Sequence, residues 1–223
     1  MSTTGQTTLS RSTLAHMIDY TLLRPEATKQ DVALLVDQGQ KMGVYGVCVS
    51  PSLLPLDGQG LKVVTVCGFP SGAHHPKVKA AEASLAAVHG ADEVDMVVNL
   101  GAIYQDRWNL VDLEIAAVRT ALPDAVVLKV IIESAALNAS QIIKACQVAE
   151  QAGANFVKTS TGFHSAGGAS PRAVELMAGA VGGRLGIKAS GGIKTAADAL
   201  ALVAAGATRL GMSAPGAILD ALV

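Results

Sequence analysis

Residues 139–161 read ASQIIKACQVAEQAGANFVKTST and contain a helical pattern, a helix stop and a strand in immediate succession. Apolar side chains recur at helical spacing over 139–152, and the sequence GAN at 153–155 provides the glycine that ends a helix at its carboxyl end. The same signal, as GAD at 90–92 and GAT at 206–208, precedes two other β-rich runs. Helices that lead directly into buried strands are typical of an α/β fold with a parallel sheet.

The same alternation divides the rest of the chain. We expect strands at 18–23, 44–50, 62–69, 93–99, 126–133, 155–161, 185–190 and 208–213. Helical patterns follow all of them but the second, at 29–42, 76–89, 108–122, 139–152, 171–179, 195–205 and 215–223. The strands begin about 27 residues apart, which suits one strand, one helix and two short connections. The pattern predicts a single closed (β/α)8 barrel domain over 1–223, with 1–13 as an N-terminal extension or helix.

An open doubly wound sheet is the alternative fold. Such a sheet carries a glycine-rich G-x-G-x-x-G turn after its first strand. The residues at the end of the first expected strand, Leu22-Leu23-Arg24-Pro25, contain no glycine. The barrel is therefore favoured.

Composition excludes several other classes of protein. The chain is 50% hydrophobic and 16% charged, which excludes a disordered chain and a long coiled coil. Its 17 basic and 18 acidic residues give a net charge of −1, so no strong field attracts nucleic acid or an anionic membrane. The longest apolar stretch, 199–207, is about half the length of a membrane-spanning helix, and 1–11 has no signal-peptide core. We expect a soluble cytoplasmic protein that binds neither nucleic acid nor membranes.

Neither a metal nor another cofactor is expected. Cys48, Cys67 and Cys146 lie in apolar surroundings without C-x-x-C spacing, and the adjacent His74 and His75 lack the spacing of metal ligands. We expect the cysteines to be buried small hydrophobic residues.

Charged residues interrupt several of the aliphatic runs, toward the strand ends where a barrel places its active site. Lys129, Lys158 and Lys188 each lie alone in an apolar run, and carboxylates interrupt 93–99. An ion pair or a lysine that reaches solvent would explain any one of them equally well. Three together favour catalysis. Lys158 and Lys188 belong to neighbouring expected strands, where burial and like charge would lower a lysine pKa and yield a nucleophilic amine.

Carboxylates near these lysines suggest the proton-transfer groups. Asp95, on the fourth expected strand, could serve as the proton shuttle for a carbinolamine. Lys129 and Glu133, which would face the same side of a strand at i and i+4, could form a charge relay.

Glycines after the last three expected strands suggest a phosphate site. Gly162 follows the sixth strand, Gly191 and Gly192 follow the seventh, and Gly211 with Ser213 closes the eighth. Turn formation alone would explain each of them. Barrels nevertheless bind phosphate with the loops after strands seven and eight, where backbone amides meet the anion.

Five motifs together resemble the deoxyribose-phosphate aldolase family. They are IDYTLL at 18–23, VCGFP at 66–70, DEVDMV at 92–97, FVKTSTGF at 156–163 and KASGGI at 188–193. The resemblance extends from about Ile18 to Ile218. It implies a class I aldolase without a metal, which cleaves 2-deoxy-D-ribose 5-phosphate into D-glyceraldehyde 3-phosphate and acetaldehyde in deoxyribonucleoside breakdown. It also implies a homodimer or a higher homo-oligomer.

The resemblance also assigns roles to individual residues. Lys158 becomes the Schiff-base nucleophile, Lys188 the neighbour that lowers its pKa, and Asp95 the proton donor and acceptor. Supporting roles are expected for Asp19, Thr21, Cys48, Lys129 and Glu133, and phosphate binding for Gly162, Gly191, Gly192, Gly211 and Ser213.

This chain departs from the family pattern at several positions. Tyr20 stands where His is usual, Met212 where Thr or Ala is common, and Ala214 where a second Ser often follows. The sequence ends in ALV at 221–223, whereas some members end in a segment with a Tyr that aids proton transfer. Two alternatives stay open: another barrel lyase of phosphorylated sugars, and a non-catalytic phosphosugar-binding barrel. The presence of both lysines and Asp95 speaks against the second.

Overall fold

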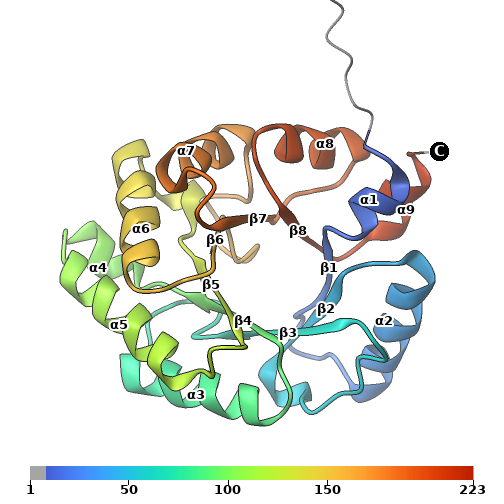
Figure 1. Cartoon of the computed structure of the whole chain (residues 1–223), viewed down its shortest axis with the longest axis horizontal. Coiled ribbons are helices and arrows are strands. Elements are labelled where there is room, and N and C mark those ends of the chain that lie inside the picture. The colour runs from blue at the N-terminus through green and yellow to red at the C-terminus, as the bar shows by residue number, and fades with distance from the viewer. Residues whose placement is uncertain (1–8, 223) are drawn as a thin grey trace, which may run out of the picture.

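Eight parallel strands close into a barrel in the computed structural model, which describes residues 9–222 (Figure 1). The strands are β1 Ile18–Leu22, β2 Gly46–Val49, β3 Lys62–Cys67, β4 Glu93–Val97, β5 Val127–Ile131, β6 Phe156–Lys158, β7 Gly186–Ser190 and β8 Arg209–Met212. Each strand pairs with the next along the chain, and β8 pairs with β1. The predicted (β/α)8 barrel is confirmed, and the open sheet is wrong.

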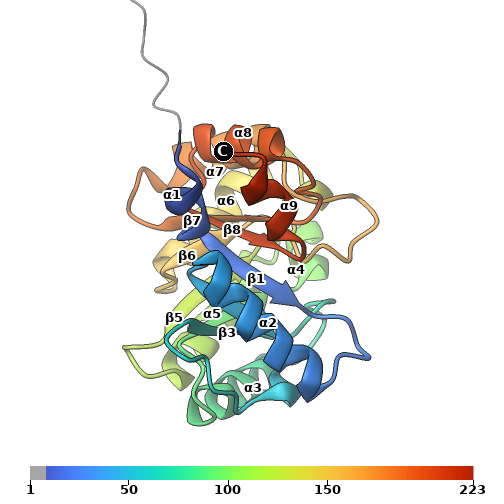
Figure 2. The same cartoon turned by 90° about the vertical axis from the view of Figure 1, so that its right-hand side faces the viewer.

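Helices surround the barrel on its outer side (Figures 1 and 2). They are α1 Arg11–Ala15, α2 Lys29–Met42, α3 Pro76–Val88, α4 Leu100–Tyr104, α5 Trp108–Ala121, α6 Ala139–Gln151, α7 Pro171–Val181, α8 Ala196–Ala204 and α9 Pro215–Asp220. The connection after β2 contains only the 3-10 turn Pro51–Leu53, which confirms the predicted loop. Sequence patterns missed the short helix α4.

The two ends of the chain depart from the expected boundaries. Of the expected extension 1–13, residues 1–8 lie outside the described residues, and α1 begins at Arg11 and continues to Ala15. The helix expected over 215–223 ends at Asp220, and Val223 also lies outside the described residues.

The predicted helix stops have the backbone conformation that glycine favours. Gly90, Gly153 and Gly206 have φ angles of 88°, 87° and 117°, in the left-handed region that L side chains rarely adopt. Each follows the last turn of a helix and precedes a strand. These glycines therefore end α3, α6 and α8 where the sequence predicts it.

The apolar core is divided between the two faces of the sheet. The larger part lies between strands and helices and includes Val94, Val130 and Val157. Inside the barrel, the buried apolar cluster is Cys48, Val64 and Val66. No helix within residues 9–222 is long and apolar enough to cross a membrane. The inside of the barrel therefore holds few large apolar groups and leaves room for polar ones.

Strand register directs the charged side chains into this interior. Lys158 on β6 is the register partner of Lys188 on β7, and Asp95 on β4 is the partner of Lys129 on β5. Register partners on adjacent strands face the same side of a sheet, and residues two apart share a face. The lysines predicted from three separate runs consequently converge on one region.

Candidate active site

Seven buried charged residues share the interior of the barrel, and none of these residues is more than 7% exposed. They are Asp19, Glu93, Asp95, Lys129, Lys158, Lys188 and Arg209. Four of them are basic and three are acidic. An uncompensated buried charge is costly, so the interior is neutral only if one of the basic groups gives up its proton.

Asp95 lies at the centre of this network. Its Oδ1 accepts a hydrogen bond from Lys129 at 2.7 Å, and its Oδ2 accepts from Lys158 at 2.8 Å and from Lys188 at 2.7 Å. Burial alone would raise the pKa of Asp95, but the three lysines outweigh it and hold that pKa well below its usual range. Asp95 is therefore ionised.

The environments of Lys158 and Lys188 differ in what they do to the two amines. Burial lowers the pKa of Lys158, the positive charge of Lys188 lowers it further, and Asp95 opposes both. Burial would also lower the pKa of Lys188, but the charges of Asp19 and Asp95 outweigh it and raise that pKa. Lys158 is thus the basic group that most readily becomes neutral.

Both causes expected from the sequence lower the pKa of Lys158. Its burial is the larger cause, and the like charge of Lys188 is a smaller one. The side chain of Lys158 is only 4% exposed, so most of its hydration is lost.

Glu93 and Arg209 complete the network and were not singled out from the sequence. Glu93 Oε2 lies 2.5 Å from Lys129 Nζ, and Arg209 Nη1 donates to Asp19 Oδ1 at 2.9 Å. The Arg209 guanidinium also stacks 3.4 Å from the ring centroid of Tyr45. Arg209 interrupts an apolar strand just as the lysines do, so the criterion that identified them would have found it.

The expected relay between Lys129 and Glu133 is wrong. Glu133 accepts hydrogen bonds from the amide of Thr161 at 3.2 Å and from its hydroxyl at 2.6 Å. Strand β5 ends at Ile131, and Glu133 has a left-handed φ of 55°, so the alternation of a strand does not extend to it. Glu133 instead holds the residue that precedes Gly162.

Thr21 and Cys48 lie close to the lysines. Thr21 lines the pocket above Lys158, and its hydroxyl donates to the backbone carbonyl of Asp19 at 2.9 Å. Cys48 is completely buried, and burial raises the pKa of its thiol. The Cys48 side chain is therefore an uncharged neighbour of the amines.

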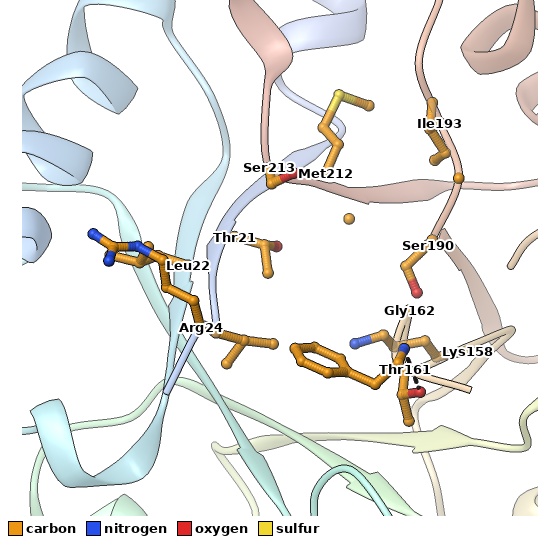
Figure 3. A pocket seen from close by; sticks show the side chains of 15 residues that line it. Thr21, Leu22, Arg24, Lys158, Thr161, Gly162, Ser190, Ile193, Met212 and Ser213 are labelled. Atoms are coloured by element: carbon orange, nitrogen blue, oxygen red, sulfur yellow. Dashed lines mark hydrogen bonds between the residues drawn. The ribbon is translucent and has the colours of Figure 1, made fainter. Parts of the chain in front are cut away.

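A pocket of about 450 Å³ opens above Lys158 at the carboxyl ends of β6, β7, β8 and β1 (Figure 3). Its lining includes every residue predicted for phosphate binding, namely Gly162, Gly191, Gly192, Gly211 and Ser213. Phe163 and Arg24 also line it, and neither was predicted. One cavity therefore joins the buried amine to the glycine loops.

Backbone amides in these loops are free to bind an anion. Within residues 9–222, the amides of Gly162, Gly191, Gly192 and Ser213 donate to no protein acceptor. The three glycines have φ angles of 85°, 82° and 79°. Successive amides exposed in such loops form a concave site for phosphate.

Gly211 has an additional role in packing. A Cβ atom at this position would lie 3.1 Å from Cε of Lys188 and 3.0 Å from Cβ of Ser190. The absence of a side chain thus gives Lys188 room inside the barrel.

Metal ligands are not gathered at this site. No group of three His, Cys, Asp or Glu side chains within residues 9–222 is placed to hold a metal ion. That the protein needs no cofactor stays a prediction.

Comparison with protein families agrees with this geometry. Residues 13–218 match the model of the DeoC/LacD family of aldolases. The chain belongs to the DeoC/LacD aldolase family. This aldolase is 61% identical over 211 residues to the deoxyribose-phosphate aldolase of Nocardia farcinica, which covers 95% of both chains. It is 58% identical over 215 residues to that of Kocuria rhizophila, which covers 96% of this chain and 99% of the other.

Solved structures resemble this aldolase across nearly its whole length. A deoxyribose-phosphate aldolase from Aeropyrum pernix superposes with a TM-score of 0.88 at 34% identity, over 95% of this chain and 92% of the other. A protein from Coccidioides immitis described as a putative deoxyribose-phosphate aldolase gives the same TM-score at 38% identity, over 95% and 85%.

Two of the departures from the family pattern lie away from the pocket of this aldolase. Tyr20 donates to Oε1 of Gln38 at 2.9 Å and, with Ala214, lines a second cavity beside α2 and α9. Met212 borders the active-site pocket, but its side chain is buried in the apolar core between strands and helices and points away from Lys158 in Figure 3.

Proposed function

We propose that this aldolase is a class I deoxyribose-phosphate aldolase. The substrate would be 2-deoxy-D-ribose 5-phosphate, and the products D-glyceraldehyde 3-phosphate and acetaldehyde, in deoxyribonucleoside breakdown. The observation that carries the proposal is Lys158, a buried amine of lowered pKa that lines the same pocket as the unpaired amides of the glycine loops. Relatives with this name that are 61% and 58% identical support it.

The first half of the proposed reaction forms the Schiff base. The lone pair of Lys158 Nζ attacks the C1 carbonyl carbon of the open-chain sugar, and the carbonyl oxygen takes up a proton from solvent water to give a carbinolamine. Asp95 Oδ2, 2.8 Å from Nζ, accepts the proton that the amine loses and returns it to the hydroxyl, which leaves as water. The resulting iminium carries its positive charge beside the carboxylate of Asp95.

The second half breaks the C2–C3 bond. Asp95 accepts the proton of the C3 hydroxyl, the bond electrons move into the iminium, and glyceraldehyde 3-phosphate leaves. The same proton is returned to C2 of the enamine, and water hydrolyses the new iminium to acetaldehyde and free Lys158, with release of a proton to solvent. Lys188 is protonated and lies 2.7 Å from Asp95 Oδ2. Its positive charge favours the release of a proton from the Asp95 carboxyl group back to the reacting groups.

Assembly and location follow the same proposal. We infer one barrel domain per chain, assembled as a homodimer or a higher homo-oligomer in the cytoplasm. A tetrameric assembly is described for the Aeropyrum pernix protein, which supports an oligomer.

Chemical trapping tests the Schiff base directly. Acetaldehyde with sodium borohydride should add one ethyl group to Lys158, located by peptide mass spectrometry, because only a neutral accessible amine forms the iminium at neutral pH. Lys158→Met should abolish the adduct, whereas Lys144→Met, an exposed lysine on α6, should leave it unchanged. Labelling at Lys188 instead, or none, would contradict the assignment.

Turnover tests the substrate. The protein should release acetaldehyde from 2-deoxy-D-ribose 5-phosphate, measured by coupled NADH oxidation, and should not cleave longer keto-sugar phosphates at a comparable rate. Faster cleavage of a keto-sugar phosphate would favour another sugar-phosphate lyase, and calorimetric binding without cleavage would favour a binding protein.

A further inference from the structure

The pocket has few positive charges with which to bind a phosphate dianion. Among the described residues that line it, Lys158 and Arg24 have basic side chains. Lys158 hydrogen-bonds to Asp95 and is the proposed nucleophile, so it is not available to the phosphate. Arg24 is then the side chain that can supply the counter-charge.

Arg24 is fixed at the rim of the pocket by its backbone. It follows the end of β1, its carbonyl accepts from the amide of Ala27 at 3.1 Å, and Pro25 restricts the backbone of Arg24, which precedes it. Strand β1 pairs with β8, whose carboxyl end leads to Ser213. The backbone of Arg24 therefore belongs to the same arc of loops as the free amides.

The guanidinium itself points away from the site. Figure 3 shows the Arg24 side chain turned away from Lys158, toward α2. Its Nη2 lies 2.8 Å from Oδ1 of Asp31, and its Nη1 lies 3.5 Å from Oε1 of Glu26. The side chains of Arg24, Asp31 and Glu26 are 44%, 32% and 68% exposed, and ion pairs so exposed contribute little to stability.

Asp31 does not depend on Arg24 for its own position. Its second oxygen, Oδ2, accepts from the amide of Thr28 at 2.8 Å and from its hydroxyl at 2.7 Å. The contact with the Thr28 amide, together with the Asp31 amide that donates to Oγ1 of Thr28 at 3.2 Å, forms the capping box that begins α2. Rotation of the arginine would leave the cap in place and return only Oδ1 to water.

We propose that Arg24 is a phosphate-binding residue of this aldolase, whose guanidinium exchanges Asp31 for the phosphate of the substrate. The planar guanidinium offers two parallel N–H donors to two phosphate oxygens, next to the amides of Gly192 and Ser213. The inference rests on the proposed function, because it takes the 5-phosphate of that substrate as the ligand. Arg24 would determine the preference for a phosphorylated over a free sugar.

A purely structural arginine is the competing explanation. In that case Arg24 would only hold the loop before α2 through Asp31, and its loss would affect all substrates equally. Phosphate binding affects only substrates that carry a phosphate, so a pair of substrates separates the two roles.

The test compares steady-state kinetics on 2-deoxy-D-ribose 5-phosphate and on 2-deoxy-D-ribose. Arg24→Gln should raise KM for the phosphorylated sugar about ten- to a hundredfold, the usual effect of losing a hydrogen bond to a charged group. Its kcat/KM for the free sugar should stay within about twofold of the unchanged protein, since no phosphate contact is lost. Arg24→Lys should retain part of the preference for the phosphorylated sugar, because lysine keeps the positive charge but lacks the two parallel N–H donors of the guanidinium.

A matched control removes a charge at the same end of the barrel. Arg172 lies in the first turn of α7, where its side chain is 75% exposed and paired with Glu175. Arg172→Gln should leave the KM and kcat/KM for both sugars unchanged. Equal losses on both substrates with Arg24→Gln, or no loss, would overturn the inference.

Phosphate binding separates this inference from the proposed function. If the unchanged protein cleaves neither sugar, the proposed function fails, and isothermal titration with inorganic phosphate still decides the role of Arg24. Weaker phosphate binding by Arg24→Gln than by Arg172→Gln supports the inference, and equal binding by the two variants contradicts it.

Discussion

Lys158 and Lys188 are register partners on β6 and β7, and their Nζ atoms lie 2.8 Å and 2.7 Å from the same oxygen of Asp95. Two ammonium groups at one carboxylate oxygen repel each other, so the arrangement favours one amine and one ammonium. Lys188 has a second carboxylate partner in Asp19, whereas Asp95 is the one carboxylate that forms a salt bridge with Lys158 within residues 9–222. The asymmetry therefore assigns the neutral state to Lys158.

Removing the charge of Lys188 should move the pH dependence of catalysis upward. The charge of Lys188 helps lower the pKa of Lys158, so Lys188→Met raises that pKa toward the usual lysine value. A higher pKa leaves less free amine at neutral pH, and the acidic limb of kcat/KM against pH should shift to higher pH. Lys144→Met is the control and should not shift it. An unchanged limb in a variant that keeps its native circular dichroism would refute this role for Lys188.

Much of the fold and the catalytic centre was predictable because packing makes its exceptions visible. Strands buried on both faces are aliphatic, so a single lysine such as Lys158 or Lys188 contrasts with its run. Parallel strands bring their carboxyl ends to one face, so runs distant in sequence can be placed together. Glycines such as Gly153 marked the ends of helices, because the left-handed φ needed there is one that glycine adopts readily.

Other features depend on geometry that residue spacing does not contain. The relay between Lys129 and Glu133 assumed that β5 continues to Glu133, whereas the strand ends at Ile131. Helix α4 has five residues, too few to show a helical period. The degree to which burial exceeds like charge at Lys158 depends on its exposure, which follows from the packing of the whole barrel.

The charge balance of the interior should be measurable as coupling between Glu93 and Arg209. Glu93→Gln leaves the basic side chains with one carboxylate fewer, and we expect it to lower the free energy of unfolding by about 3–5 kcal/mol. Arg209→Met, which removes a cation that lies 3.3 Å from Glu93, should cost a similar amount. With Lys158 neutral, the double variant keeps two cations and two carboxylates, and it should be more stable than the sum of the two losses predicts, by about 0.5–3 kcal/mol. Urea denaturation of all four proteins measures the cycle, and additive losses would contradict the charge-balance argument.

Gly191→Ala should weaken phosphate binding more than Gly192→Ala does. Both residues have a left-handed φ, of 82° and 79°, so both variants carry a backbone strain of about 1–2 kcal/mol. A Cβ at Gly191 would also lie 3.2 Å from the Cα atoms of Gly162 and Gly168, whereas a Cβ at Gly192 would meet nothing within 4 Å. Only Gly191→Ala should displace the neighbouring loop. Its KM for 2-deoxy-D-ribose 5-phosphate should be several-fold higher than the KM of Gly192→Ala. Equal KM values in the two variants would count against a tightly packed phosphate loop.

Glu133→Gln should impair substrate binding without changing the pH dependence of Lys158. The carboxylate accepts from both the amide and the hydroxyl of Thr161, and its replacement by an amide loses charge-assisted hydrogen bonds that are roughly twice as strong as neutral ones. Thr161 precedes Gly162, so the loop should loosen and KM for the phosphorylated sugar should rise about tenfold. Because Glu133 is hydrogen-bonded to Thr161 rather than to the amines, the acidic limb of kcat/KM should stay where it is. If the acidic limb of kcat/KM shifts together with KM, Glu133 acts on the amines through Lys129. A change in KM alone establishes Glu133 as a positioning residue.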